Sequence, residues 1–259
     1  WLYITVNKQM NQERNAPLTA RSVLASTLLG VDPPELPVAY LVHVAGLFGI
    51  NDNRARVALS RMVGSGEATT DGAGRYRLAG RLLDRQERQL ASRAGHTGPW
   101  SGEWRVVVVT TSGSSAEIRS RRRSALRFAR LGELREGVWM RPDNLEVRLD
   151  PDVARDATLL LARPDGEPRQ LAASLWDVDG WGQRARRLMA SMDAHPTRAP
   201  ADLAPGFELS ASVLRHLQAD PLLPEDLLPA GWPGGGLREQ YDGWDAGYRS
   251  VLETWSRTG

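Results

Sequence analysis

The stretch "GINDNRARVALSRMVGSGEATTDGAGRYRL", residues 49–78, combines an amphipathic helical pattern with two short extended pieces. A helix advances by about 100° per residue, so each side of it can be read from the sequence. One side carries apolar side chains, with Val63 at its border: Ala55, Ala58, Leu59 and Met62. The other side is mainly polar: Asn53, Arg54, Arg56, Val57, Ser60 and Arg61. The pattern predicts a helix from about Asn51 that buries the first side and exposes its arginines.

The surrounding segments predict two further helices and a hairpin. One helix begins after the capping residue Thr19 and stops at Gly30, and another runs from about Val38 to Leu47 with an apolar stripe. The prolines of "DPPELP" (32–37) indicate a turn between them. After the third helix, "ATT" and "RYRL" flank the turn "DGAG". Three helices and a hairpin are the order of a winged helix-turn-helix, whose third helix enters the major groove of DNA.

The middle of the chain predicts a ferredoxin-like α+β domain over residues 99–168. "EWRVVVVTT" is typical of a central strand, and "GVWMRP" and "DATLLLAR" indicate two more strands. The amphipathic segment "AEIRSRRRSALRFARLG" lies between them, and one helix on several strands is the pattern of such a domain. Five of its residues are expected to face the core: Ile118, Ala125, Leu126, Phe128 and Ala129.

The C-terminal part reads as acidic and helical. Helices are expected in "WDVDGWGQRARRLMASMDAH", with Asp177 or Asp179 as N-cap, in "GFELSASVLRHLQADP" and in "REQYDGWDAGYRSVLETWSR". "GWPGGG" (231–236) is read as a flexible turn. The expected fold class is therefore α+β with several domains. The expected parts are an N-terminal arm (1–16), a winged helix-turn-helix domain (17–80), a connecting helix (81–98), the ferredoxin-like domain (99–168) and a helical domain (169–259). The arm is expected to be either disordered or vector-derived.

The charge distribution favours a polyanionic partner for the front half. The 259 residues carry a net charge of only +2, but residues 16–130 contain 17 arginines and 9 acidic residues. Residues 131–259 contain 14 arginines and 21 acidic residues. The chain has no cysteine, no apolar stretch long enough to cross a bilayer and no secretory pattern at its start, so we expect a cytoplasmic protein without a membrane segment.

The sequence offers little catalytic or metal-binding chemistry. The histidines His43, His96, His195 and His216 are far apart, with no metal-ligand spacing. "SGSS" (112–115) lacks the lysine of a phosphate-binding loop and is read as a turn and N-cap. We therefore expect no catalytic residue, no metal and no cofactor.

The candidate DNA-binding residues lie on the third helix and in the hairpin. The helix supplies Asn51, Asn53, Arg54, Arg56, Ser60 and Arg61. Arginine can pair with guanine and asparagine with adenine, each pair contributing roughly 1–3 kcal/mol of discrimination. Arg75 and Arg77 of the hairpin are expected to contact the DNA backbone. The alternative is an ordinary solvated arginine face, and "RSRRRSALRFAR" (119–130) is either a second nucleic-acid patch or a face that meets an acidic segment or a partner subunit.

Several motifs resemble the PaaX family of bacterial transcriptional regulators. They include "RSVLASTLLG", "LFGINDNRARVALSRMVGSGEA", "LWDVDGW" and, most specifically, "HLQADPLLPEDLLPAGWPG" (216–234). The resemblance implies a homodimeric repressor of a catabolic operon, which binds double-stranded DNA and responds to a small-molecule effector such as an acyl-CoA thioester. It also implies a central domain similar to a CRISPR-associated nuclease fold. The resemblance carries no effector-binding residue, so that site stays unassigned.

Two alternatives differ in class from a DNA-binding regulator. The first is a metal-dependent nuclease built on the central domain. The nuclease-like relatives have an acidic residue at the end of the first central strand, where this chain has Thr110 and Thr111, so metal-dependent cleavage is not expected. The second is a binding module without a ligand, controlled by a partner protein alone.

Overall fold

The computed structural model describes residues 18–110 and 115–258, and the expectations for the arm, for Thr111 and for most of "SGSS" lie outside them. The fold is mixed α/β with two antiparallel sheets. The chain divides into two compact units that are not continuous in sequence. Unit 1 comprises the described residues up to Leu90, together with His195–Ala211 and the residues from Trp244 onward. Unit 2 comprises Ala91–Ala194 and Ser212–Gly243.

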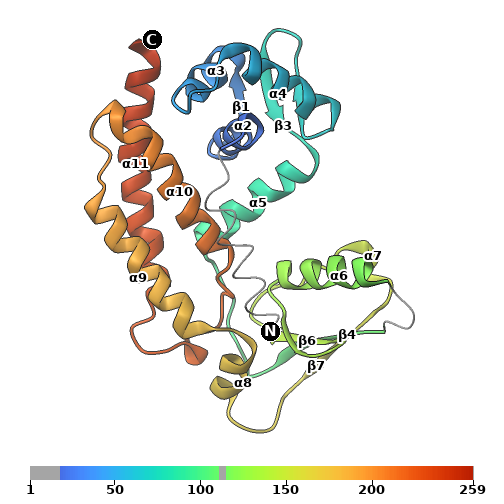
Figure 1. Cartoon of the computed structure of the whole chain (residues 1–259). Helices are drawn as coiled ribbons and strands as arrows, with labels where there is room; N and C mark the ends of the chain where they lie inside the picture. The colour runs from blue at the N-terminus through green and yellow to red at the C-terminus, as the bar shows by residue number, and fades with distance from the viewer. Residues whose placement is uncertain (1–17, 111–114, 259) are drawn as a thin grey trace. The chain divides into compact units, whose positions relative to one another are not determined.

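Unit 1 begins with three helices and a small three-stranded sheet (Figure 1). The strand order is β1-β3-β2, and both pairings are antiparallel. The expected helices and hairpin strands are all present, but β1, within "DPPELP", was not predicted. These elements are α2 (Ala20–Leu29), β1 (Glu35–Pro37), α3 (Val38–Gly46), α4 (Asp52–Gly64), β2 (Ala68–Thr70) and β3 (Arg75–Leu78).

Local signals in the sequence set the ends of these helices. The hydroxyl of Thr19 accepts a hydrogen bond from the backbone N–H of Ser22, which caps α2 as expected. The side-chain oxygen of Asn51 accepts from the backbone N–H of Arg54 at 3.0 Å and caps α4 in the same way. Gly49, between α3 and α4, has a φ of +67°, a conformation that glycine adopts without steric cost.

The three helices and the sheet share one apolar core. Ala55, Leu59 and Met62 of α4 are almost completely buried, as the helical projection predicts. They pack with buried residues of the other elements: Val23, Leu24, Leu28, Leu41, Ala45, Ala68, Leu78 and Leu82. Burial of the inner side of α4 fixes which of its side chains point outward.

C-terminal segments complete unit 1. The ring of Phe207 lies 5.0 Å from that of Phe48, and the ring of Trp255 stacks on His43 at 3.9 Å. Both C-terminal partners lie on long helices, α10 (Leu203–Gln218) and α11 (Gly234–Thr258). The α3 region is thus packed against residues more than 150 positions away in sequence.

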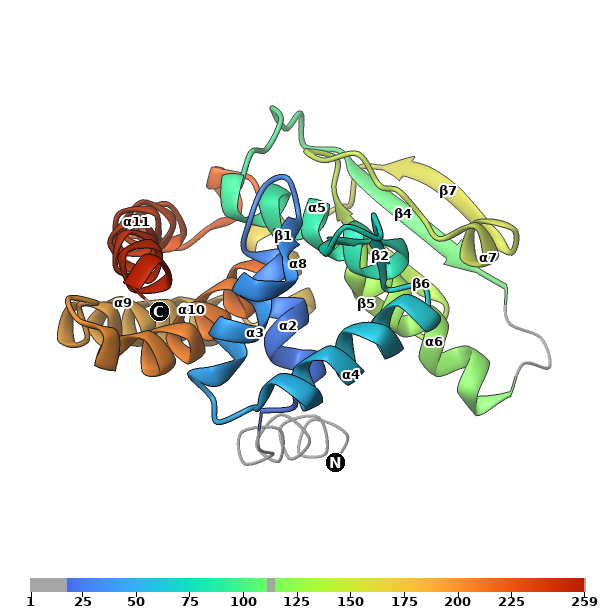
Figure 2. The same ribbon diagram turned by 90° about the horizontal axis from the view of Figure 1, so that it is seen from above.

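Unit 2 is built on a four-stranded antiparallel sheet with the order β5-β6-β4-β7 (Figure 2). With its two connecting helices it has the βαββαβ order of the expected ferredoxin-like domain. The predicted strands are present, and β4 is central, whereas β5 and the short α7 were not predicted. The elements are β4 (Trp104–Val109), α6 (Ala116–Phe128), β5 (Gly132–Arg135), β6 (Val138–Pro142), α7 (Pro151–Ala154) and β7 (Ala157–Ala162).

Each face of this sheet contributes to an apolar cluster. Val107 and Val109 of β4 pack with Leu126 of α6, whereas Trp104, on the other face, packs with Leu223 of the segment that follows α10. Leu126 is buried as expected and Ala125 and Ala129 are partly buried, but the expectation for two residues of α6 is wrong. Ile118 and Phe128 are 39% and 51% exposed, because α6 turns only the narrow side around Leu126 onto the sheet.

The remaining helices confirm most of the C-terminal prediction. The side chain of Asp177 accepts a hydrogen bond from the backbone N–H of Gly180, so it is the capping residue of α9. The reading of "GWPGGG" as a turn is wrong for its last three glycines, because α11 already begins at Gly234, directly after Pro233. No helix in the described part of the chain is long and apolar enough to cross a membrane. The elements not yet named are α5 (Gly80–Ala94), α8 (Pro168–Leu175), α9 (Val178–Ala194) and the short 3-10 turns η2 (Pro200–Asp202) and η3 (Glu225–Leu227).

Candidate nucleic-acid interface

The outer side of α4 is exposed at every position expected to read DNA. Asn53, Arg54, Arg56, Ser60 and Arg61 all have exposed side chains, opposite the buried side of the helix. Asn51 is exposed too, but its amide oxygen is already engaged in capping the helix. The helix therefore presents a polar face on a rigid, packed support, the arrangement that precise recognition requires.

In the part of the chain that the structure describes, no carboxylate neutralises the exposed arginines of α4. Within residues 18–110 and 115–258, Arg54, Arg56 and Arg61 form no ion pair. Val57 lies among them and is 42% exposed. An exposed valine between arginines can contact the methyl group of a thymine, as other small apolar side chains do. The helical projection put Val57 on this face, but it was not included among the candidate binding residues.

The hairpin arginines have a different environment. Arg75 and Arg77 alternate with Tyr76 and Leu78 along β3, so the two guanidinium groups project from one face of the small sheet. Glu35 of β1 lies opposite Arg77 in the pairing register. Its carboxylate accepts a hydrogen bond from Nε of Arg75 at 2.5 Å and from Nε of Arg77 at 2.7 Å. These two hydrogen bonds hold the pKa of Glu35 below its usual value, and the bond from Arg75 has the larger effect.

The tip of the hairpin is fixed by a carboxylate. The side chain of Asp71 accepts hydrogen bonds from the backbone N–H groups of Arg75 at 2.9 Å and Ala73 at 2.8 Å. These bonds lower the pKa of Asp71, so it stays ionised at neutral pH. Gly72 and Gly74 have positive φ values, which lets the chain reverse over four residues. The two arginines of β3 are thus held at the end of a defined turn.

A groove of about 720 Å³ lies between the start of α2 and the outer side of α4. Asn53, Arg54 and Arg61 form part of its wall. Arg21 and Glu67 also line it and form an ion pair with each other. Since Arg54 and Arg61 bring positive charge and pair with no carboxylate among residues 18–110 and 115–258, the groove suits an anionic ligand such as a phosphate group.

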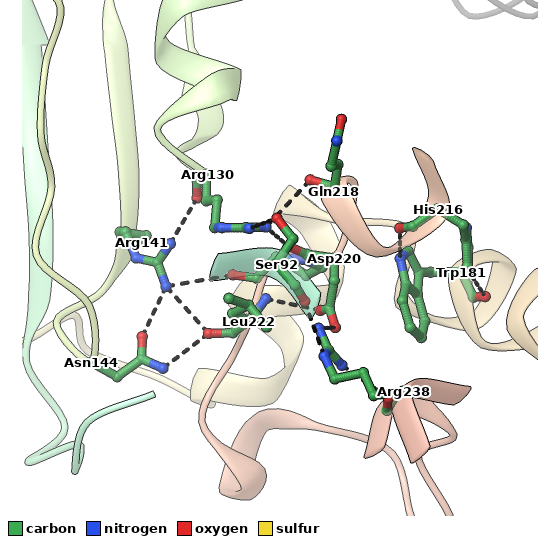
Figure 3. A network of polar contacts seen from close by, with 12 residues as sticks. Ser92, Arg130, Arg141, Asn144, Trp181, His216, Gln218, Asp220, Leu222 and Arg238 are labelled. Atoms are coloured by element: carbon green, nitrogen blue, oxygen red, sulfur yellow. Dashed lines mark hydrogen bonds and ion pairs between the residues drawn. The ribbon is translucent and has the colours of Figure 1, made fainter. Parts of the chain in front are cut away.

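A second polar cluster lies inside unit 2, where its side chains bind one another and the backbone and so hold parts of the fold together (Figure 3). Arg141 is almost completely buried and donates to Asn144 at 2.9 Å and to the carbonyl of Leu222 at 3.2 Å. Burial lowers its pKa to about 9, so the guanidinium remains charged at neutral pH. Arg238 forms an ion pair with the buried Asp220 at 2.8 Å. These contacts attach the motif "HLQADPLLPEDLL" to the central sheet.

Arg130 connects the same motif to the end of α5. It donates to the carbonyl groups of Gln218 and Asp220 and to the hydroxyl of Ser92 at 2.7 Å. Arg238 also donates to the carbonyl of Ser92, at 3.1 Å. Of the three arginines in this cluster, only Arg238 contacts the buried carboxylate of Asp220, whereas Arg130 and Arg141 donate mainly to backbone carbonyls. Sequence reasoning missed this cluster because its members are spread over about 150 residues.

Comparison with known proteins agrees with the resemblance read from the motifs. Residues 19–82 match the family model of PaaX-like proteins, and residues 97–159 match the model of the central Cas2-like domain of PaaX proteins. Both models describe a class of transcription regulators. The chain belongs to the PaaX family. No curated protein matches it significantly.

A solved structure extends the likeness over nearly the whole chain. It is an uncharacterized protein from Mycobacterium tuberculosis that is 42% identical, with a TM-score of 0.71. The match covers 91% of this chain and 98% of that one. Within the described residues, no group of three or more histidines and acidic residues is arranged to hold a metal ion. The family matches give no support to the nuclease alternative.

Proposed function

We propose that the chain is a sequence-specific, double-stranded DNA-binding regulator, in which α4 reads bases and the β2–β3 hairpin is the wing of a winged helix-turn-helix domain. One observation carries the proposal: α4 exposes three arginines, which pair with no carboxylate of the described residues, beside Asn53, Ser60 and Val57, while its opposite side is buried in a core. A helix of this kind fits the major groove of B-DNA, where each base pair presents a distinct pattern of donors, acceptors and methyl groups.

The roles of the basic side chains follow from their surroundings. Arg56 and Asn53 would contact base edges, and Arg54 and Arg61, beside the groove, would bind phosphates. Arg75 and Arg77 would contact the DNA backbone only by exchanging the carboxylate of Glu35 for a phosphate. The wing would therefore contribute less affinity than two free arginines.

The proposed layout keeps the expected boundaries for the DNA-binding part (17–80), the connecting helix (81–98), the ferredoxin-like domain (99–168) and the helical part (169–259). The chain would act as a homodimer and place two α4 helices on half-sites about 34 Å apart, or a multiple of that distance. It would repress a catabolic operon from the cytoplasm.

The proposed effector is an aryl- or acyl-CoA thioester. To release the DNA, its binding would have to favour a conformation in which the distance between the two α4 helices no longer matches the spacing of the half-sites. Thermal shift with a panel of acyl-CoA thioesters tests this idea, since a ligand at 100 times its dissociation constant stabilises a protein by about 2.7 kcal/mol. If no thioester raises the melting temperature, control by a partner protein alone becomes the better account.

A gel-shift experiment tests the DNA-binding function. Purified protein is titrated against DNA from the region upstream of its own gene, at about 100 mM salt, with scrambled DNA of the same composition as the control. A shift of the upstream fragment at a protein concentration that leaves the scrambled fragment free supports the proposal. Equal affinity for both fragments contradicts sequence-specific recognition.

A further inference from the structure

Val57 is an apolar residue in the middle of the polar outer side of α4, and it is 42% exposed. The nearby apolar residues Ala58 and Val63 are partly buried against the core of unit 1, whereas Val57 is not a member of that core among the described residues. A β-branched residue also has a slightly lower helix propensity than alanine or leucine. Neither packing nor helix stability therefore accounts for a valine at this position.

Polar and positively charged side chains surround Val57 on the helix surface. Residues three or four positions apart are neighbours there, with about 5–6 Å between their Cβ atoms. Asn53 and Arg54 lie one turn before Val57. Ser60 and Arg61 lie one turn after it, and all four of these residues are exposed. Val57 also lines the groove between α2 and α4, so it is an apolar contact point within a hydrophilic, basic face.

This combination indicates DNA rather than an apolar protein surface as the partner of Val57. Arg54, Arg56 and Arg61 pair with no carboxylate of residues 18–110 and 115–258, so the face attracts a polyanion. In the major groove of B-DNA, the base edges present hydrogen-bond donors and acceptors and one apolar group, the C5-methyl group of thymine. A contact between this methyl group and the γ-methyl groups of Val57 removes apolar surface of both partners from water. Thymine is thus the base that complements Val57.

We propose that Val57 is a specificity-determining residue that reads the C5-methyl group of a thymine in the DNA site. The inference rests on the proposed function, and it names the chemical group that one position of the reading helix recognises. Burial of one methyl-sized group contributes about 0.8 kcal/mol, which is about a fourfold change in affinity. Loss of this methyl group is therefore expected to weaken binding about fourfold at one thymine of each half-site.

Replacement of single thymines by deoxyuridine tests the contact directly, because the two bases differ only in this methyl group. Each thymine of the operator fragment is replaced in turn, and the dissociation constant is measured by fluorescence anisotropy at about 100 mM salt. For the wild type, we expect a thymine in each half-site at which uracil weakens binding about fourfold. If every thymine tolerates the replacement, Val57 does not read a methyl group.

A substitution of Val57 assigns the effect to this side chain. In Val57→Ala the γ-methyl groups are absent, so the uracil penalty at that thymine should fall below about twofold, a coupling that a double-mutant cycle measures. The slope of log K against log[salt] should stay unchanged, because no phosphate contact is lost. Leu134→Ala, which removes a similarly exposed apolar side chain from β5, should keep the full penalty. A full penalty in Val57→Ala overturns the proposal.

The possible outcomes separate this inference from the proposed function. A protein that prefers operator over scrambled DNA, but has the same uracil penalty in the wild type and in Val57→Ala, refutes only the role of Val57. A protein without any preference for operator DNA refutes the proposed function, and the methyl contact with it. The uracil penalty is a ratio of two affinities of the same protein, so a general loss of stability in the variant does not alter it.

Discussion

The Nε atom of Arg77 lies 2.7 Å from a carboxylate oxygen of Glu35, directly across the β1–β3 pairing. The same carboxylate also binds Arg75. The two arginines of the β2–β3 hairpin therefore share one carboxylate in the free protein, which balances about half of their charge. In the proposed DNA complex, phosphates would have to compete with Glu35 for both guanidinium groups, and this competition leads to the first prediction.

Glu35→Gln should strengthen DNA binding on all sequences alike. The substitution keeps the shape of the side chain and removes its charge, so Arg75 and Arg77 become available to phosphates. Each additional phosphate contact steepens the salt dependence of the binding constant, with a change of about 0.9 in the slope of log K against log[salt]. Fluorescence anisotropy over a series of salt concentrations measures affinity and slope together.

A matched control separates this effect from the general change in charge. Glu146→Gln removes the same charge from an exposed Glu146–Arg148 pair in unit 2. It should leave the salt slope unchanged. If Glu35→Gln and Glu146→Gln behave alike, the hairpin does not touch the DNA backbone.

Asp220→Asn should strongly destabilise unit 2. The carboxylate of Asp220 is 2% exposed and pairs with Arg238, while Arg130 and Arg141 lie close by. Removing the negative charge leaves buried arginines without compensation, which typically costs about 3–5 kcal/mol. Urea unfolding followed by circular dichroism measures this loss.

Asp242→Asn is the control for that experiment. Asp242 forms an ion pair with Arg93 in the same unit, but its side chain is 54% exposed. Surface ion pairs contribute at most about 1 kcal/mol, so this variant should unfold almost as the wild type does. Equal losses in the two variants would show that the buried cluster is not a stabilising element.

His216 should make unit 2 sensitive to acid. Its ring stacks on Trp181 at 4.3 Å, and desolvation lowers its pKa to about 4. Below about pH 6.5 the unfolded chain binds a proton at this histidine, whereas the folded chain does so only near pH 4. Protonation therefore favours the unfolded state, and the free energy of unfolding falls as the pH drops from about 6.5 toward 4. The melting temperature measured from pH 4 to 8 should therefore decline on the acid side.

Substitution of the histidine identifies its share of this decline. His216→Gln cannot titrate, so its melting temperature should fall less steeply between pH 6.5 and 4 than that of the wild type. His96→Gln, which changes an exposed histidine of the same unit, should keep the wild-type slope. Parallel curves for all three proteins would exclude His216 as the cause.

The sequence was most informative where local patterns determine the structure. The two sides of α4, its start near Asn51, the cap Thr19 and the hairpin strands all follow from local patterns within one segment. Glu35 could not be assigned in the same way, because its role depends on a pairing across about 40 residues and β1 lies within a proline-rich turn. Long-range pairing of this kind leaves no periodic signal.

The central domain shows the same limit. The strand β4 was evident from its run of valines, but β5 has a charged, four-residue sequence that resembles a loop. Ile118 and Phe128 are apolar residues on an amphipathic helix, yet both remain exposed. Helical spacing predicts which residues share a side, whereas the width of the buried side depends on the partner sheet. The apolar β7 strand was predicted, but its edge position was not.

Base preference of an Arg56→Ala variant tests the central claim most directly. Wild type and variant are each allowed to select from a randomised operator library at about 100 mM salt, with Arg75→Ala as the comparison. Arg56→Ala should relax the preference at one base pair by about 1–3 kcal/mol, whereas Arg75→Ala should weaken binding to all sequences equally and lower the salt slope by up to about 1. If Arg56→Ala leaves both affinity and base preference unchanged, the outer side of α4 is a solvated arginine face and does not read DNA.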